Sequence, residues 1–151
     1  MSTVIRRVGT LIAIAGLTAA CSSPSGSSGG AQTVVATEKE WAITLASSNF
    51  SAGKITINVT NDGDKEHEFV IRKTDLQSDS LPTNADGEVE EDDPQLAEVG
   101  DPSEIGSVPA GSSDKSITLD LKPGHYVIFC NIHDQDLLHY QKGMHTDFTV
   151  S

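Results

Sequence analysis

The sequence predicts an all-β fold, a β-sandwich interrupted by one long acidic loop. Apolar and polar residues alternate in three segments, which is the period-2 pattern of half-buried strands. Residues typical of turns separate the strand candidates, and no long stretch after residue 33 shows the 3.6-residue periodicity of a helix. Several short strands with regular turn signals are typical of a β-sandwich. The alternating segments are 55–59, 117–121 and 148–150.

Four further stretches combine β-branched, aromatic and other apolar residues and also qualify as strands. Turn signals fall between the candidates. The turn at Lys122-Pro123-Gly124 suits type II, because proline fits its second position and glycine accepts the positive φ of its third. In chain order, the strand candidates are 34–37, 41–45, 55–59, 67–72, 117–121, 125–130 and 146–150.

The segment 74–105 departs from this pattern, because it is polar and carries an acidic run at 86–94. A connection of this length inside a compact domain is uncommon, and such connections are often functional or mobile. Two interpretations stay open. The segment is either a solvated excursion at the surface or a recognition surface for a cationic partner.

The first twenty residues have the features of a secretion leader. Arg6 and Arg7 supply a positive end, and residues 8–20 form an uncharged apolar stretch too short to span a bilayer comfortably. The leader ends in Leu-Thr-Ala-Ala-Cys, which resembles a bacterial lipobox, so we expect Cys21 to be lipidated and to become the mature N-terminus. The alternative is an ordinary cleavage site beside an unmodified Cys21.

The chain is therefore expected to have three parts. A lipoprotein signal peptide occupies 1–20, and the lipidated Cys21 begins a Gly/Ser-rich tether at 21–32, which is too polar and flexible to form a core. One folded domain occupies 33–151. This division predicts a domain held at the outer face of a bacterial membrane, on the periplasmic or cell-envelope side.

The charge of the chain excludes some partners. The formal net charge of −12 includes Arg6 and Arg7 but no acidic residue of the leader, so the mature chain carries −14. Such acidity argues against binding to nucleic acid and against lying flat on anionic lipid. With Cys21 acylated, Cys130 has no partner for a disulfide, and a lone cysteine in an oxidising compartment is either packing or a metal ligand.

Metal-ligating side chains gather near the C-terminus. Cys130 ends a strand candidate, and His139 and Met144 follow on one loop; after the leader, Met144 is the only methionine. A further histidine, His67, begins an upstream strand candidate. Two histidines, one cysteine and one weakly bound methionine form the ligand set that type 1 copper prefers. His125 and His145, in contrast, are expected to lie at the surface.

From residue 33 onward the chain resembles the cupredoxin family of blue copper proteins, which includes the plastocyanins and azurins. The motifs that carry the resemblance are Asn-Asp-Gly at 61–63 with the strand at 67–71, Pro-Gly-His-Tyr at 123–126, Cys-Asn-Ile at 130–132, His-Tyr at 139–140 and Gly-Met at 143–144. The resemblance implies a Greek-key β-sandwich of seven or eight strands. It also implies one copper ion held by His67, Cys130, His139 and Met144.

The loop between the cysteine and the second histidine departs from the family. Cupredoxins commonly place two or four residues there, whereas eight lie between Cys130 and His139. His133 has the short spacing after Cys130 but leaves ten residues before Met144. We favour His139, because an insertion at 134–138 between otherwise intact flanks accounts for the spacing, and copper accepts either imidazole.

The resemblance implies an electron carrier with a single type 1 copper, and we expect a monomer. The acidity of the mature chain predicts redox partners with a basic surface, and a partner with an apolar docking patch is the alternative. A copper-trafficking protein of the cell envelope and a metal-free interaction module are the alternatives. We expect no enzymatic activity, because the sequence lacks a local signature of a Cys/His nucleophile, a His-x-His pair and a phosphate-binding loop.

Overall fold

The structure is a computed structural model that describes residues 31–135 and 137–151. The predicted signal peptide, Cys21 and most of the tether lie outside these residues. In the described part, no helix is long and apolar enough to cross a membrane. Its elements are β1 (Gln32–Lys39), β2 (Ala42–Leu45), β3 (Asn49–Phe50), β4 (Gly53–Asn61), β5 (His67–Lys73), η1 (Ser78–Ser80), β6 (Glu104–Val108), β7 (Lys115–Leu121), β8 (Gly124–Phe129), β9 (His133–Asp134), β10 (Leu137–Leu138), η2 (Tyr140–Lys142) and β11 (His145–Val150).

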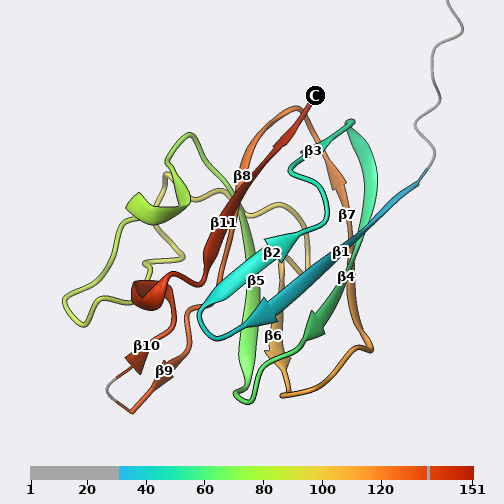
Figure 1. Cartoon of the computed structure of the whole chain (residues 1–151). Coiled ribbons are helices and arrows are strands. Elements are labelled where there is room, and N and C mark those ends of the chain that lie inside the picture. Colours follow the sequence, from blue (N-terminus) through green and yellow to red (C-terminus); the bar gives the residue numbers. More distant parts are fainter. Residues whose placement is uncertain (1–30, 136) are drawn as a thin grey trace, which may run out of the picture.

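Two mixed sheets face each other (Figure 1), in agreement with the predicted β-sandwich. One has the strand order β2-β1-β4-β7 and the other β3-β11-β8-β5-β6. Parallel pairing joins β1 to β4 and β3 to β11, and the remaining neighbours are antiparallel. The two sheets hold nine strands within the described residues, more than the seven or eight expected. The short β3 and β6 are strands for which the sequence shows no alternation.

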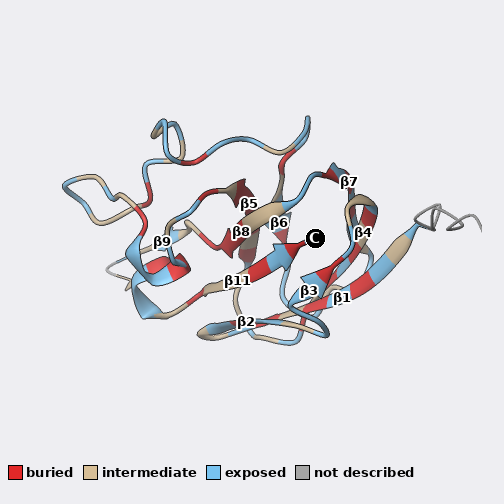
Figure 2. Ribbon diagram, turned by 90° about the horizontal axis from the view of Figure 1, so that it is seen from above, coloured by how far each residue is buried: buried red, intermediate tan, exposed pale blue. Residues whose placement is uncertain are grey.

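The main core fills the space between the sheets (Figure 2). Every second residue of β4 and β7 points into it, and all of the alternating positions predicted for these two strands are buried. The opposite sheet contributes aromatic and branched side chains from β5, β8 and β11. The largest of these are Phe69, Tyr126, Ile128 and Phe148.

A second, smaller core explains the long acidic segment. Residues 74–103 cover the face of β5 and β8 that points away from β1 (Figure 2), and we call this segment the insert. Its buried apolar residues pack on the outer face of the sheet, so the insert is not simply a solvated excursion, although most of its acidic residues are at least partly exposed. The expected end at residue 105 is also too late, because β6 begins at Glu104. The apolar residues that the insert buries are Leu81, Val89 and Leu96.

Candidate metal centre

Two of the predicted ligands are placed by strand pairing. Strands β5 and β8 are antiparallel, with Val70 opposite Phe129, so the start of β5 and the end of β8 reach the same pole of the sandwich. His67 is the first residue of β5, and Cys130 follows the last residue of β8. The Glu68 backbone N–H donates a hydrogen bond to Cys130 Sγ over 3.3 Å, which ties the two strand ends together.

The third side chain comes from the loop after β8. His139 Nδ1 lies 3.2 Å from His67 Nδ1 and 3.3 Å from Cys130 Sγ. The ligand atoms of these three residues lie within 4.8 Å of one another, and all three side chains are buried. This is the one cluster of at least three His, Cys, Asp or Glu ligands, within the described residues, that could hold a metal ion.

Met144 lies at the same pole and is fully buried in the main core beside Cys130. Its carbonyl accepts a hydrogen bond from the Cys130 N–H over 3.0 Å, and its own N–H donates to the His139 carbonyl over 3.1 Å. The preceding Gly143 has a φ of 108°, a conformation that glycine adopts without steric cost, and this lets the chain turn from η2 into β11. The four residues singled out in the sequence therefore meet at one end of the sandwich.

His133, the competing loop histidine, does not join the cluster. It lies on strand β9, its side chain is 42% exposed, and its Nδ1 lies 3.3 Å from Glu88 Oε1. The structure thus places His139, rather than His133, beside Cys130. In the described part of the loop, β9 pairs with β10, and the chain returns to the site at His139.

His125 and His145 are less free than the sequence suggests. His125 Nε2 lies 3.0 Å from Asp147 Oδ1, and its Nδ1 contacts the Thr74 carbonyl at 2.8 Å. His145 Nδ1 contacts Ser78 Oγ at 3.0 Å. Both histidines are half-buried, because the insert covers this face of β8 and β11. Although Ser78, His145 and Asp147 include the residue types of a hydrolytic triad, Ser78 is only 3% exposed, which closes it to a substrate.

The protonation states of the cluster suit a metal. Burial lowers the pKa of His67, and the neighbouring His139 adds to the effect, while burial also lowers the pKa of His139. Both rings are therefore neutral near pH 7, the form in which imidazole binds metals. Burial raises the pKa of the Cys130 thiol to about 12. A bound cation reverses this preference, because it stabilises the thiolate directly.

The donor set fits a type 1 copper site. Two imidazole nitrogens and a sulfur face one another in a dry pole, with a thioether residue beside them, and this combination is the one that such copper prefers. The outer Nε2 atoms of His67 and His139 are buried and make no hydrogen bond within the described residues. Hydrogen bonding alone therefore does not account for two buried imidazoles beside a thiol.

Two residues of the β1–β2 turn flank the histidines, and neither was predicted as part of the site from the sequence. Glu40 Oε1 lies 3.4 Å from His67 Nε2, out of line for a hydrogen bond, and accepts a hydrogen bond from the Lys65 N–H over 2.7 Å. The Trp41 ring stands edge-on to His139, with 5.0 Å between ring centroids. The only signal for them in the sequence is the single tryptophan of the chain, next to a glutamate in a short turn.

Buried carboxyl groups lie close to the cluster as well. Glu38 is fully buried and its oxygens have no hydrogen-bond partner among the described residues. Burial, and then the charge of Glu68, raises its pKa to about 8. Burial, followed by the charges of Glu91 and Glu104, raises the pKa of Glu68 to about 7. These two groups hold protons at pH values where ordinary glutamates have lost them.

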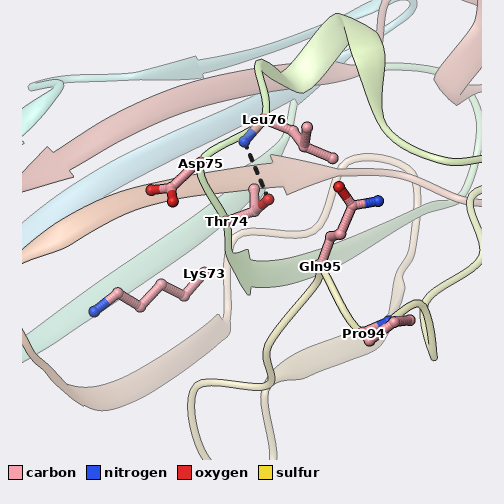
Figure 3. Close-up of a pocket in the computed structure, with 6 residues that line it drawn as sticks. All are labelled: Lys73, Thr74, Asp75, Leu76, Pro94 and Gln95. Atoms are coloured by element: carbon pink, nitrogen blue, oxygen red, sulfur yellow. Dashed lines mark hydrogen bonds between the residues drawn. The ribbon is translucent and has the colours of Figure 1, made fainter.

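Two pockets mark the two ends of β5. One of about 410 Å³ opens beside the cluster and is lined by Lys65, Glu66, Ile132, His133, Asp134 and His139. The other, of about 350 Å³, lies where Lys73 ends β5 (Figure 3), and the insert contributes Leu76, Pro94 and Gln95 to it. The Thr74 hydroxyl accepts a hydrogen bond from the Leu76 N–H there, so its polar groups are partly engaged already.

Comparison with known proteins bears on the fold. No protein-family model matches the chain, and no curated protein matches it by sequence. The described fold is similar to reduced auracyanin from the photosynthetic bacterium Roseiflexus castenholzii, with a TM-score of 0.54, 22% identity and coverage of 82% of this chain and 99% of that one.

Two further solved structures agree. Rusticyanin from Thiobacillus ferrooxidans has a TM-score of 0.54 at 19% identity, with 82% of this chain and 79% of that chain covered. Auracyanin A from Chloroflexus aurantiacus, described as a "blue" copper protein, has a TM-score of 0.53 at 16% identity, with 81% and 100% covered. The chain therefore has the cupredoxin fold, and the predicted β-sandwich is confirmed.

Proposed function

We propose that this protein is a mononuclear type 1 copper protein that carries electrons between redox partners. In this proposal His67, Cys130 and His139 are the strong ligands and Met144 is the weak axial ligand. The observation that carries the proposal is the convergence of two neutral imidazoles and one thiol, all buried, at one pole of a cupredoxin fold. Bound copper would supply one-electron chemistry by alternating between Cu(I) and Cu(II).

The residues around the ligands would keep the site rigid. The β5–β8 pairing brings the two strand ends together, His67 pairs with Val108 of β6, and the Cys130 N–H donates to the Met144 carbonyl, so main-chain pairing supports both positions. The Glu68 N–H bonded to Cys130 Sγ would draw electron density from the thiolate and so tune the reduction potential. The surrounding apolar core excludes water, which also affects the potential.

An electron would leave most directly through His139. Its ring lies between the cluster and the pocket lined by Lys65, Ile132 and Asp134, whereas His67 is enclosed. A partner that covers this pocket would come within a few residues of the ligands. The acidic chain favours a partner with a basic surface, and such an encounter would slow as ionic strength rises.

The proposed location is the outer face of a bacterial membrane, with an acylated Cys21 as the anchor. A tether of about nine Gly/Ser-rich residues has a root-mean-square reach of roughly 15–18 Å, which would confine a monomeric carrier near membrane redox enzymes. This proposal rests on the sequence of residues 1–32. Replacement of Cys21 by serine should release the protein from the membrane fraction, and a variant that stays bound would refute the anchor.

The test of the copper proposal is metal loading with a visible spectrum. Cu(II) added to the purified domain should give an intense blue or green thiolate charge-transfer band that ascorbate bleaches, at one copper per chain. The change Cys130→Ser should abolish the band. A colourless protein that holds Cu(I) and passes it to an acceptor would instead support a trafficking role. A protein that binds no copper would support the other alternative, a metal-free interaction module.

A further inference from the structure

The insert contacts the ligand loop on both sides of His139 and next to Cys130. We propose that the insert is a brace that holds the loop 131–144 in its metal-binding shape before a metal arrives, with Asn131 as its central contact. The proposal deepens the copper function and rests on it, but it concerns the metal-free chain as well. It also gives the acidic segment a role other than partner recognition.

Asn131 follows Cys130 directly, and its side-chain amide forms three hydrogen bonds with the insert. Its Oδ1 accepts a hydrogen bond from the Val89 N–H over 2.8 Å, and its Nδ2 donates to the Val89 carbonyl over 3.0 Å and to Glu91 Oε1 over 2.9 Å. Glu91 also accepts a hydrogen bond from Arg72 Nη2 over 2.8 Å. Asn131 is therefore linked through the insert to Arg72, a buried residue of β5.

The other side of the loop is held in the same way. Tyr140 follows His139, and its hydroxyl accepts a hydrogen bond from the Leu81 N–H over 2.9 Å. The Tyr140 ring is buried in the second core, with Phe129 edge-on at 6.3 Å between centroids. Next along the chain, Gln141 Nε2 donates to the Gly87 carbonyl over 3.1 Å.

The brace would reduce the entropic cost that a long ligand loop adds to metal binding. Eight residues separate Cys130 from His139, and in the described part of this loop the main-chain pairing consists of the two-residue strands β9 and β10 and of one hydrogen bond from the His139 N–H to the Ile132 carbonyl. A loop that is free in the metal-free chain must lose its conformational entropy when the metal binds, which weakens binding. Contacts from the insert hold both ends of the loop in advance, so this cost is met during folding. His139 then faces His67 and Cys130 without a metal.

The decisive experiment compares Asn131→Ala with Tyr140→Phe and with the control Gln95→Ala. Asn131→Ala removes all three hydrogen bonds to the insert, and Tyr140→Phe removes one acceptor while keeping the ring. Gln95 lies in the insert but hydrogen-bonds only to Asp93 among the described residues. Two readouts are needed: amide hydrogen exchange of the metal-free proteins, and copper affinity with the visible spectrum and reduction potential of the loaded proteins.

We expect Asn131→Ala to speed exchange in the loop by about tenfold or more, with the amides of β4 and β7 unchanged. Its copper affinity should fall about tenfold or more, as is usual when an outer contact of a metal site is lost, and its band and potential should shift. Tyr140→Phe should show a smaller change of the same kind, and Gln95→Ala none.

Equal exchange in the loop of the wild type and both loop variants would overturn the brace. So would weaker copper binding that merely follows a loss of global stability, with an unchanged spectrum and potential. If the wild type binds no copper, the proposed function fails, yet the exchange experiment still decides whether the insert orders the loop. If Asn131→Ala does not fold, both measurements are made on Tyr140→Phe. Loop exchange and copper affinity equal to those of the wild type would then refute the proposal.

Discussion

The two halves of the metal centre are held by different means. His67 and Cys130 stand at the ends of the paired strands β5 and β8, and the Glu68 N–H bonded to Cys130 Sγ joins these two ends. His139 and Met144 lie on a loop that has main-chain hydrogen bonds of its own, and the side chains of Asn131 and Tyr140 also bind this loop to the insert. The first half depends on pairing between strands that are far apart in the sequence, whereas the second also depends on side-chain contacts with a segment some forty residues upstream.

The difference between the two halves shows where a rigid site can tolerate a long loop. The strand-borne half allows little change in spacing, because a shift of one residue turns every side chain to the other face of the sheet. The loop-borne half has accepted extra residues, since the hairpin β9–β10 folds outward and the flanks at Asn131 and Tyr140 are anchored.

The largest expected effect tests which loop histidine belongs to the centre. His139→Ala should abolish the thiolate charge-transfer band of the copper-loaded protein, because it removes a side chain that lies 3.3 Å from Cys130 Sγ. His133→Ala should leave the band nearly intact, since that ring is exposed beside Glu88. The measurement is the visible absorption spectrum at one equivalent of Cu(II), and the opposite pattern would reverse the assignment.

The two cores should differ in how much stability they supply. Leu121→Ala in the main core should lower the free energy of unfolding by about 3–5 kcal/mol, because its side chain is almost fully buried. Leu96→Ala in the second core should cost about 2–3 kcal/mol, since the insert can relax around the gap. Urea unfolding of the metal-free proteins measures both. A larger loss for Leu96→Ala would show that the insert is as important to global stability as the sandwich.

The buried carboxyl group Glu38 should make stability depend on pH. Its pKa is raised from 4.5 to about 8, so the folded chain keeps a proton that the unfolded chain releases, and stability falls as pH rises through this window. The expected loss from pH 5 to pH 8 is on the order of 3 kcal/mol. Glu38→Gln should flatten most of this slope in urea unfolding of the metal-free protein.

A residual slope is expected in that variant, because the pKa of Glu68 is also raised, to about 7, and it acts in the same direction. Stability that rises between pH 5 and pH 8 in the wild type would contradict the assignment of a protonated buried acid.

The smallest effect concerns the charge behind His67. Glu40→Gln should raise the reduction potential, because the carboxylate 3.4 Å from His67 Nε2 stabilises the more positive oxidised site. The effect should be about 1 kcal/mol or less, since water partly screens this side chain. Redox titration followed at the charge-transfer band measures it. Glu98→Gln is the matched control, because it removes the same charge from an exposed residue next to Ala97, which pairs with Lys73 at the other end of β5. An equal shift there would mean that Glu40 has no special role.

The sequence predicted some parts of the fold well and others not at all. The alternation in β4 and β7 is read directly from apolar spacing, because one face of each strand is buried. Strand β6 was missed, since it lies at the edge of a sheet and buries only Val108. The role of the insert was also missed: its acidic residues dominate the composition, while three separated apolar residues, Leu81, Val89 and Leu96, do the packing.

The all-β fold and the donor types could be predicted from the sequence, because strand periodicity is a local pattern along the chain and the scarcity of Cys and Met is a matter of composition. Only the tertiary structure decided that His139 rather than His133 faces Cys130, that Glu40 and Trp41 lie behind the two histidines, and that the insert grips the ligand loop. These are contacts between segments far apart in the sequence. They depend on how two sheets and a covering segment pack, and no local pattern of residues encodes that packing.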